Sequence, residues 1–220
     1  MALKLAGNSG ANIEVETNTL AARAVLRADD YGSLGIYSIG GTSGTIVAGS
    51  FSSAASIFSC RYAFTNIVLI KKIIISAANI TTAFTAGLIN FSLFFARSCT
   101  AQDSGGNSLN PVGDSNKFRV SDAVSNIINT IANTGALTPG TRTLDAQPLA
   151  QVQTSTPNVV GAPVLMPYPI WDSRLGEYPI VLANNEGFVI QATTPLVGTF
   201  QFTIQVTWEE VTIYGPGLAI

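Results

Sequence analysis

The chain has 220 residues, of which 47% are hydrophobic and only 11% are charged, and its formal net charge is -2. The high hydrophobic fraction excludes a disordered chain. An average soluble domain carries roughly 25% charged residues, so the low charge of this chain indicates that much of its surface contacts other proteins. The missing basic excess argues against binding to nucleic acids. The sequence contains no histidine, which excludes histidine-dependent catalytic triads and most catalytic zinc sites.

The N-terminal segment, residues 1–18, shows no strong hydrophobic period, although it includes Leu3 and Leu5. We expect it to be an extended arm that becomes ordered against neighbouring subunits, with a frayed terminus as the alternative. The segment also lacks the continuous apolar stretch of a secretory signal peptide, so none is expected.

Short strands are predicted in the next part of the chain, at residues 20–28, 34–39, 45–48 and 57–62. The stretch GGTSG at residues 40–44 lacks the Lys-Ser/Thr of a phosphate-binding loop, and no helical pattern follows it. We therefore predict a hairpin turn at this stretch and no nucleotide site.

Two strongly apolar segments follow, at residues 67–76 and 88–97. Both carry β-branched or aromatic residues on both parities, which is typical of central strands covered on two sides. Lys71 and Lys72 interrupt the first segment and Asn90 the second, so neither approaches the roughly 20 apolar residues of a membrane-spanning helix. We predict no membrane partner.

The polar loop that comes next is rich in oxygen atoms that would suit Ca²⁺. They belong to Asp103, Asn107, Asn110, Asp114 and Asn116, all within residues 100–116. Their spacing is not that of an EF-hand, and polar loops commonly have this composition. We predict no metal site here and keep calcium as the alternative.

The middle of the chain is harder to assign. Residues 122–131 place apolar side chains at helical spacing behind a Ser121/Asp122 cap, which predicts a short helix; the β-branched content leaves a strand as the alternative. A strand is predicted at residues 141–153, and a long proline-rich loop at residues 156–179. Long loops on a rigid scaffold are where contacts with partners are commonly placed.

The C-terminal part has the clearest period of two. Residues 179–183 and 187–193 flank the turn-forming residues 184–187, which predicts a hairpin. Residues 199–211 predict a long half-buried strand. Its inward parity holds Phe200, Phe202, Ile204, Val206 and Trp208.

About ten short strands with at most one helix predict an all-β fold, an antiparallel β-sandwich of jelly-roll or Greek-key type with extended terminal arms. The predicted parts are the N-terminal arm at residues 1–18, the sandwich domain at residues 19–213 and a C-terminal tail at residues 214–220. The tail, like the arm, has no strong period.

Paired acids are the first candidates for catalysis. The pairs Asp29/Asp30 and Glu209/Glu210 fall at predicted strand ends, where paired acids usually lie in solvent. Because side chains alternate along a strand, only one acid of each pair can face the core. We interpret both pairs as solvated.

Other candidate chemistry is sparse. A glycosidase-like pair needs two carboxylates that meet in space, and Asp172 with Glu177 is one such combination. The only cysteines, Cys60 and Cys99, predict buried free thiols, with a single bridge as the alternative. We predict no enzyme, and no catalytic, cofactor-binding or metal-ligating residues. We also expect no cofactor and no small-molecule substrate.

Four stretches resemble a family of structural proteins carried by tailed bacteriophages and prophages. They are FSLFFARSCTAQDSGG at residues 91–106, GTRTLDAQPL at residues 140–149, PIVLANNEGFVIQAT at residues 179–193 and FTIQVTWEEV at residues 202–211. The resemblance spans about residues 55–211. It implies a structural component of the virion, such as a capsid decoration or cement protein, and it carries no catalytic or cofactor motif.

We expect a homo-oligomer, most simply a trimer, because jelly-roll subunits on shells commonly gather around three-fold positions and a lone copy would expose too neutral a surface. The resemblance implies contacts with other capsid proteins as well. The expected location of the protein is the virion capsid, after synthesis in the host cytoplasm. The alternative is a receptor- or glycan-binding sandwich of a phage tail or fibre. In that case Tyr168, Trp171 and Tyr178 would stack on sugar rings.

Overall fold

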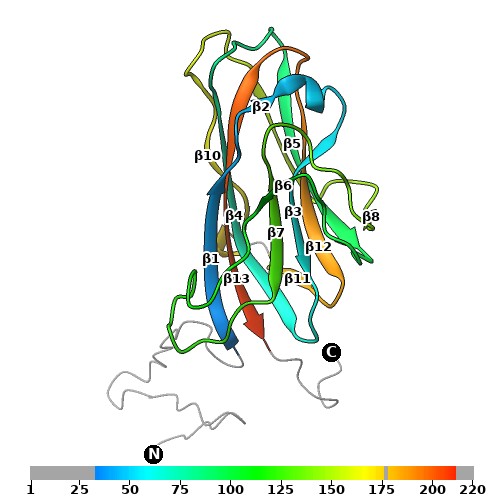
Figure 1. Ribbon diagram of the computed structural model, residues 1–220, viewed down its shortest axis with the longest axis vertical. Helices are drawn as coiled ribbons and strands as arrows, with labels where there is room; N and C mark the ends of the chain where they lie inside the picture. Colours follow the sequence, from blue (N-terminus) through cyan, green and yellow to red (C-terminus); the bar gives the residue numbers. More distant parts are fainter. Residues whose placement is uncertain (1–32, 176–177, 212–220) are drawn as a thin grey trace, which may run out of the picture. The chain divides into compact units, whose positions relative to one another are not determined.

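Alternating hydrophobicity along the strands produces two antiparallel sheets that pack face to face (Figure 1). The computed structural model describes residues 33–175 and 178–211. The predicted all-β sandwich is confirmed. The predicted N-terminal arm, the strand at residues 20–28, the C-terminal tail and Glu177 lie outside the described residues.

The first sheet has the order β1-β13-β4-β10. The short strand β2 continues β1 along the edge of β13, and β11 continues β10 along the edge of β4. The strands are β1 (Ser33–Thr42), β2 (Ile46–Val47), β4 (Ile67–Asn79), β10 (Pro163–Asp172), β11 (Ile180–Leu182) and β13 (Thr199–Val211).

The second sheet has the order β6-β7-β3-β12-β5-β8, with β9 also paired to β5. The strands are β3 (Ala55–Tyr62), β5 (Leu88–Arg97), β6 (Gly106–Ser108), β7 (Ile127–Ala132), β8 (Thr143–Leu144), β9 (Ala150–Ser155) and β12 (Glu186–Thr193). Two 3-10 turns, η1 (Ala48–Phe51) and η2 (Ser173–Leu175), complete the described elements.

The connectivity is that of a jelly roll. The eight principal strands are numbered here from first to eighth in chain order: β1, β3, β4, β5, β9, β10, β12 and β13. One sheet contains the first, eighth, third and sixth of them, in that order. The other sheet has the order second, seventh, fourth, fifth. Only β5 is followed by a strand of its own sheet, β9; each other strand of the eight up to β12 is followed by one in the opposite sheet, so the connecting loops gather at the two ends of the sandwich.

The core fills the space between the sheets. The predicted inward parity of β13 is confirmed, because each residue from Phe200 to Trp208 on that parity is at most 1% exposed. Phe202 of the first sheet stacks on Phe91 of the second, with ring centroids 5.5 Å apart. The prediction that both faces of β4 are covered is wrong, since outward residues such as Leu69 and Ile74 stay partly exposed.

The predicted helix at residues 122–131 is wrong. Ile127 begins the strand β7, which pairs antiparallel with β3, so that Ile131 lies opposite Phe58. The segment lies between β6 and β3 in the second sheet, where β-branched side chains pack well. Tertiary pairing therefore overrides the helical spacing.

Both predicted hairpin turns are also wrong. The strands β11 and β12 flank residues 183–185 but belong to different sheets, so this connection crosses the sandwich. Residues 43–45 separate β1 from β2, which lie one after the other along the same edge of β13. Turn-forming residues mark a break between strands, but they do not say whether the chain reverses, continues along the same edge or enters the other sheet.

Two further boundaries differ from prediction. The expected loop at residues 156–179 contains β10, whose pairing with β4 has register shifts on either side of Leu165 and between Pro169 and Trp171. Its prolines are tolerated because β10 is an edge strand. The single strand expected at residues 141–153 is divided into β8 and β9, and both of these pair with β5.

Candidate interaction surface

Asp103 of the predicted calcium loop is a buried structural acid. It is 3% exposed and contacts the guanidinium of Arg142, while its Oδ1 accepts a hydrogen bond from the Gly140 amide (2.9 Å). Arg142 also donates to Ser56 Oγ (2.8 Å). Burial lowers the pKa of Arg142. The ion pair joins the loop between β5 and β6 to the residues just before β8, and Arg142 ties both to β3 of the second sheet.

The other oxygen-bearing side chains of that loop also make local contacts. Asp114 pairs with Lys117 (2.9 Å). Asn110 Oδ1 accepts the Asn129 amide (2.7 Å), and Asn116 donates to a carbonyl of β1 (3.0 Å). Asn107 is exposed. Within residues 33–175 and 178–211, no group of three or more Cys, Asp or Glu side chains is placed to hold a metal ion.

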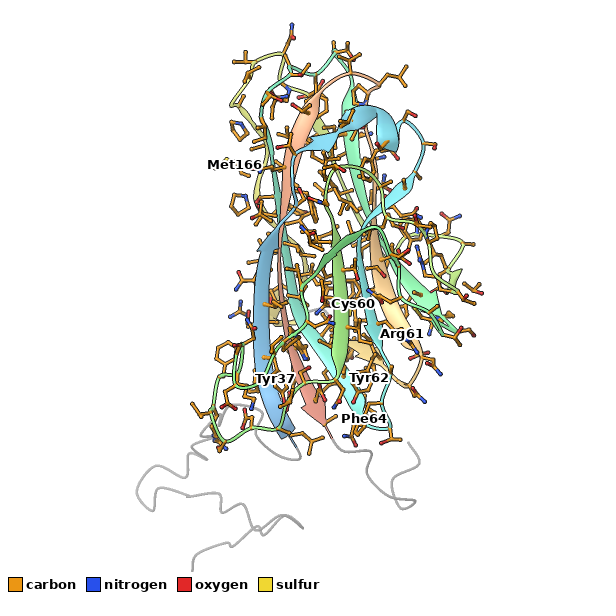
Figure 2. The ribbon with its side chains drawn as sticks, viewed as in Figure 1. Tyr37, Cys60, Arg61, Tyr62, Phe64 and Met166 are labelled. Atoms are coloured by element: carbon orange, nitrogen blue, oxygen red, sulfur yellow. The ribbon has the colours of Figure 1, made fainter. Side chains whose placement is uncertain are left out.

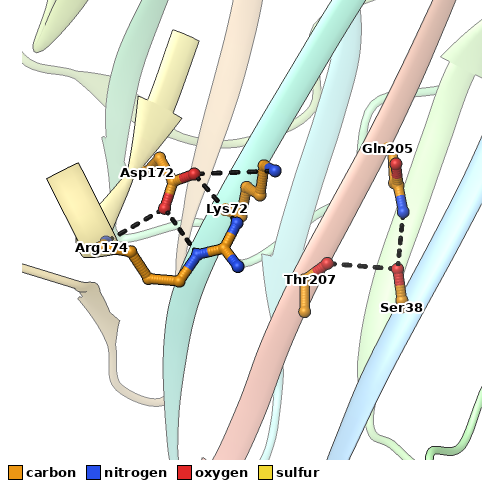
Figure 3. Close-up of polar contacts among 6 residues, drawn as sticks. All are labelled: Ser38, Lys72, Asp172, Arg174, Gln205 and Thr207. Atoms are coloured by element: carbon orange, nitrogen blue, oxygen red, sulfur yellow. Dashed lines mark hydrogen bonds and ion pairs between the residues drawn. The ribbon is translucent and has the colours of Figure 1, made fainter. Parts of the chain in front are cut away.

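Asp172, the proposed half of a glycosidase-like pair, joins the end of β10 to β4. Its carboxylate lies 3.6 Å from Lys72 Nζ and 3.2 Å from Arg174 Nη2 (Figure 3). Hydrogen bonds from Arg174 hold the pKa of Asp172 below its ordinary value. The residue is therefore a charged anchor of the edge strand.

The expectation that Glu209 and Glu210 are solvated is wrong, because they are 2% and 1% exposed. Glu209 points outward and pairs with Lys71 Nζ (3.1 Å). Glu210 points inward, and its Oε1 accepts hydrogen bonds from Ser125 Oγ (2.5 Å) and the Asn126 amide (2.9 Å). Asp29 and Asp30 lie outside the described residues.

Glu210 belongs to a buried cluster with the aromatic residues Tyr37, Tyr62 and Trp208. Figure 2 shows Tyr37 and Tyr62 toward the end of the sandwich opposite β2. Tyr37 stacks on Trp208, whose indole nitrogen donates to Ser125 Oγ (3.1 Å). Burial, and then the charge of Glu210, raises the pKa of both Tyr37 and Tyr62. The cluster joins β13 of the first sheet to the start of β7 in the second, so its role is structural.

Cys60 and Cys99 are both buried and unbonded, which confirms the predicted free thiols. Burial raises the pKa of each thiol. Thiolate is the reactive form of cysteine, so these surroundings suppress nucleophilic chemistry at both positions.

The aromatic residues proposed for sugar stacking are placed unequally. Tyr168 on β10 is 43% exposed and Tyr178 is 88% exposed, whereas Trp171 packs against the core. Met166, which is 67% exposed, belongs to the same edge strand as Tyr168 and is labelled in Figure 2. Two of the three side chains are therefore accessible to a ligand.

Charge is confined to one part of the sandwich. No charged residue occurs in residues 33–60, 73–96, 123–141, 146–171 or 187–208. These stretches supply all the loops at the end where β2 lies, the upper end in Figure 1.

We call that end the uncharged end. It consists of the loops at residues 43–54, 80–87, 156–162 and 194–198, together with adjoining strand termini. The opposite end holds the first residue of β1 and the last of β13. It also carries Arg61, Asp122 and Glu186.

Of the exposed large apolar side chains of the described residues, six lie at the uncharged end and ten lie elsewhere. The six are Val47, Leu88, Val159, Val160, Leu196 and Val197, each between 49% and 71% exposed. A solvent-facing set of loops normally carries charges of both signs. An uncharged surface with this many apolar side chains is typical of a protein contact.

Backbone hydrogen bonds join the loops of the uncharged end into one surface. They run from Ala48 N to Gly198 O (2.9 Å), from Thr85 N to Val197 O (3.2 Å) and from Thr156 N to Gly87 O (3.0 Å). Gly198 has a φ of 139°, which favours glycine, and a side chain there would collide with the buried ring of Phe84. The loops are thus fixed in place by the fold.

Neither a model of a known protein family nor a curated protein matches the chain. In the part of the chain that the structure describes, no helix has the length and hydropathy required to cross a membrane.

The sequence signal for the uncharged end is the set of long stretches without charge. The topology is needed to show that they converge.

Proposed function

We propose that the protein is a structural component of a bacteriophage virion, which decorates, cements or forms part of an icosahedral capsid through contacts between subunits. The observation that carries the proposal is the uncharged end, a hydrogen-bonded surface of apolar and hydroxyl side chains without any charge. The resemblance of residues 55–211 to structural proteins of tailed phages supports the same function.

The interior chemistry also favours a structural role. Asp103, Asp172, Glu209 and Glu210 are each buried and engaged in ion pairs or hydrogen bonds that tie one segment to another. A catalytic acid or base has to reach a substrate, and these four carboxylates are instead committed to the fold. We therefore propose a protein that is not an enzyme and that works without a cofactor.

The proposed partners are further copies of the chain, most simply in a trimer, and other capsid proteins. The proposed location is the virion, after synthesis in the host cytoplasm. The net charge of -2 provides no basic surface for nucleic acid, and we propose no membrane or small-molecule partner.

A second candidate function is recognition of a receptor or glycan by a tail or fibre. The exposure of Tyr168 and Tyr178 favours it, because accessible aromatic rings can stack on sugars. A glycan array probed with the wild-type chain and with the Tyr168→Ala and Tyr178→Ala variants tests this candidate. Binding that both substitutions abolish would support it.

The test of the main proposal is to locate the protein in purified particles. We expect it in gradient-purified virions in a fixed ratio to the other shell proteins, and we expect immunogold particles over the capsid. Label confined to the tail would favour the second candidate. Absence from the particles would contradict both.

A further inference from the structure

We infer that the uncharged end is where copies of this chain meet one another around a rotation axis. The inference deepens the proposed function, on which it rests for its biological setting, by naming the surface and its partner. The partner is the same end of a second copy.

The distribution of charge supports a partner identical to the chain itself. Residues near a rotation axis lie close to their own copies, so any charged side chain there faces a like charge at short range. Four separate stretches supply the loops of the uncharged end, and none carries a charged residue. The charges of the described residues lie elsewhere on the sandwich.

The polar groups of this end are compatible with themselves. The exposed hydroxyl residues in its loops are Thr45, Ser50, Ser52, Ser53, Thr81, Thr82 and Thr85. A hydroxyl group both donates and accepts hydrogen bonds, so it can pair with the same group on another copy. The apolar side chains among them, such as Val159 and Leu196, can pack on their own copies without any matching of charge.

A different kind of partner fits less well. Association between unlike proteins commonly relies on complementary charges, and a lipid surface is recognised by basic side chains and by tryptophan or tyrosine at the interface. The uncharged end has no basic residue, and the exposed large aromatic residues of the described chain are Phe64, Phe118, Tyr168 and Tyr178, all outside its loops.

The end is also preorganised for contact with a neighbouring copy. Its loops are joined by backbone hydrogen bonds, so little conformational freedom is lost on association.

The test places a charge near the proposed axis. Val197→Lys and Val197→Glu are each made in the full chain, with Val124→Lys and Val124→Glu as controls. Val197 and Val124 are both 49% exposed, and Val124 precedes Ser125 of the aromatic cluster at the other end. Circular dichroism and thermal melting verify folding. Sedimentation velocity measures the oligomeric state of each variant and of an equimolar mixture of the two Val197 variants.

We expect an oligomer for the wild type and for both Val124 variants. Each Val197 variant alone should dissociate at least about tenfold more readily, because like charges at an interface are repulsive. The mixture should recover the oligomer, since opposite charges then meet at the axis. If a Val197 variant fails to fold, Leu196, which is 71% exposed, supplies a second Lys/Glu pair for the same experiment.

A monomeric wild type, unchanged oligomers of the Val197 variants, or a mixture that does not recover would each overturn the inference. These results are separate from the fate of the proposed function. A monomeric chain that is found in virions overturns only the contact, whereas an oligomer that behaves as expected but is absent from virions overturns only the virion role.

Discussion

Trp208 and Thr207 are neighbours in β13 with opposite surroundings. Trp208 is fully buried, stacks on Tyr37 and donates to Ser125. Thr207 faces outward, and its hydroxyl lies 3.2 Å from that of Ser38 (Figure 3). Trp208→Ala should lower the free energy of unfolding by about 3–5 kcal/mol, and Thr207→Ala by less than about 1 kcal/mol.

Urea unfolding of the two variants measures this contrast between adjacent positions. Equal losses would mean that both faces of β13 are buried, as they would be if a neighbouring subunit covered the outer one. A negligible loss at Trp208 would contradict the assignment of its face.

The buried ion pair between Asp103 and Arg142 makes a second prediction. Asp103→Asn leaves the Arg142 charge buried without its partner, so we expect a loss of about 3–5 kcal/mol in the free energy of unfolding. The control is Asp145→Asn, which breaks a partly exposed pair with Arg97 and should cost less than about 1 kcal/mol. Similar losses for the two variants would refute a special role for the buried pair.

At the scale of single residues, alternation is enough to predict which side chains of β13 face the core. It does not predict the burial of Glu209 and Glu210. Glu209 is covered through its ion pair with Lys71, and Glu210 through Ser125, which is 85 positions away in the sequence. No local sequence pattern identifies these partners, because their positions depend on the order of strands in the sheets.

At the scale of elements, Asp172 links β10 to β4 and predicts a pH dependence. Its pKa is lower in the folded protein than the ordinary carboxyl value of about 3.9, so the charged form stabilises the fold at neutral pH. This contribution is lost as the pH falls through the lowered pKa.

Asp172→Asn should therefore reduce the difference in unfolding free energy between neutral pH and about pH 3. Arg174→Gln should have the same direction of effect, because it removes the hydrogen bonds that lower the pKa. Urea unfolding at both pH values gives the difference. If the difference in unfolding free energy between the two pH values were unchanged or larger in Asp172→Asn, the charged Asp172 would not be stabilising the attachment of β10 to β4.

The regular strands are predictable because they alternate, whereas the connections are not. The segment of β7 resembles a helix in sequence because Ile127 and Ile131 satisfy both spacings, and only pairing with β3 decides between them. The turns before β2 and β12 have the residues of hairpins. In a jelly roll, however, such turns send the chain along an edge or into the other sheet.

For the whole molecule, we predict that the terminal segments contribute to assembly more than to the sandwich. Deletion of residues 1–12, or of residues 214–220, should leave the melting temperature within a few degrees of the wild type, because the described strands pair with one another. Particle binding, measured on the same samples, should weaken. A deletion that unfolds the domain would identify that end as part of the core.

The uncharged end shows what sequence and structure contribute separately. The stretches without charge can be read directly from the chain, but they are far apart in it. Strand order and register bring their loops to one end and join them by hydrogen bonds. Composition thus predicts contacts with other proteins, and the topology shows which loops share the uncharged end.

The most direct test of this account is sedimentation velocity of the purified full chain at micromolar concentration, in about 0.05 M and about 1 M NaCl. A contact made by apolar and hydroxyl groups is insensitive to screening, so we expect the same oligomer, most simply with the mass of three chains, at both salt concentrations. A monomer in both, or an oligomer that dissociates in high salt, would contradict assembly through the uncharged end.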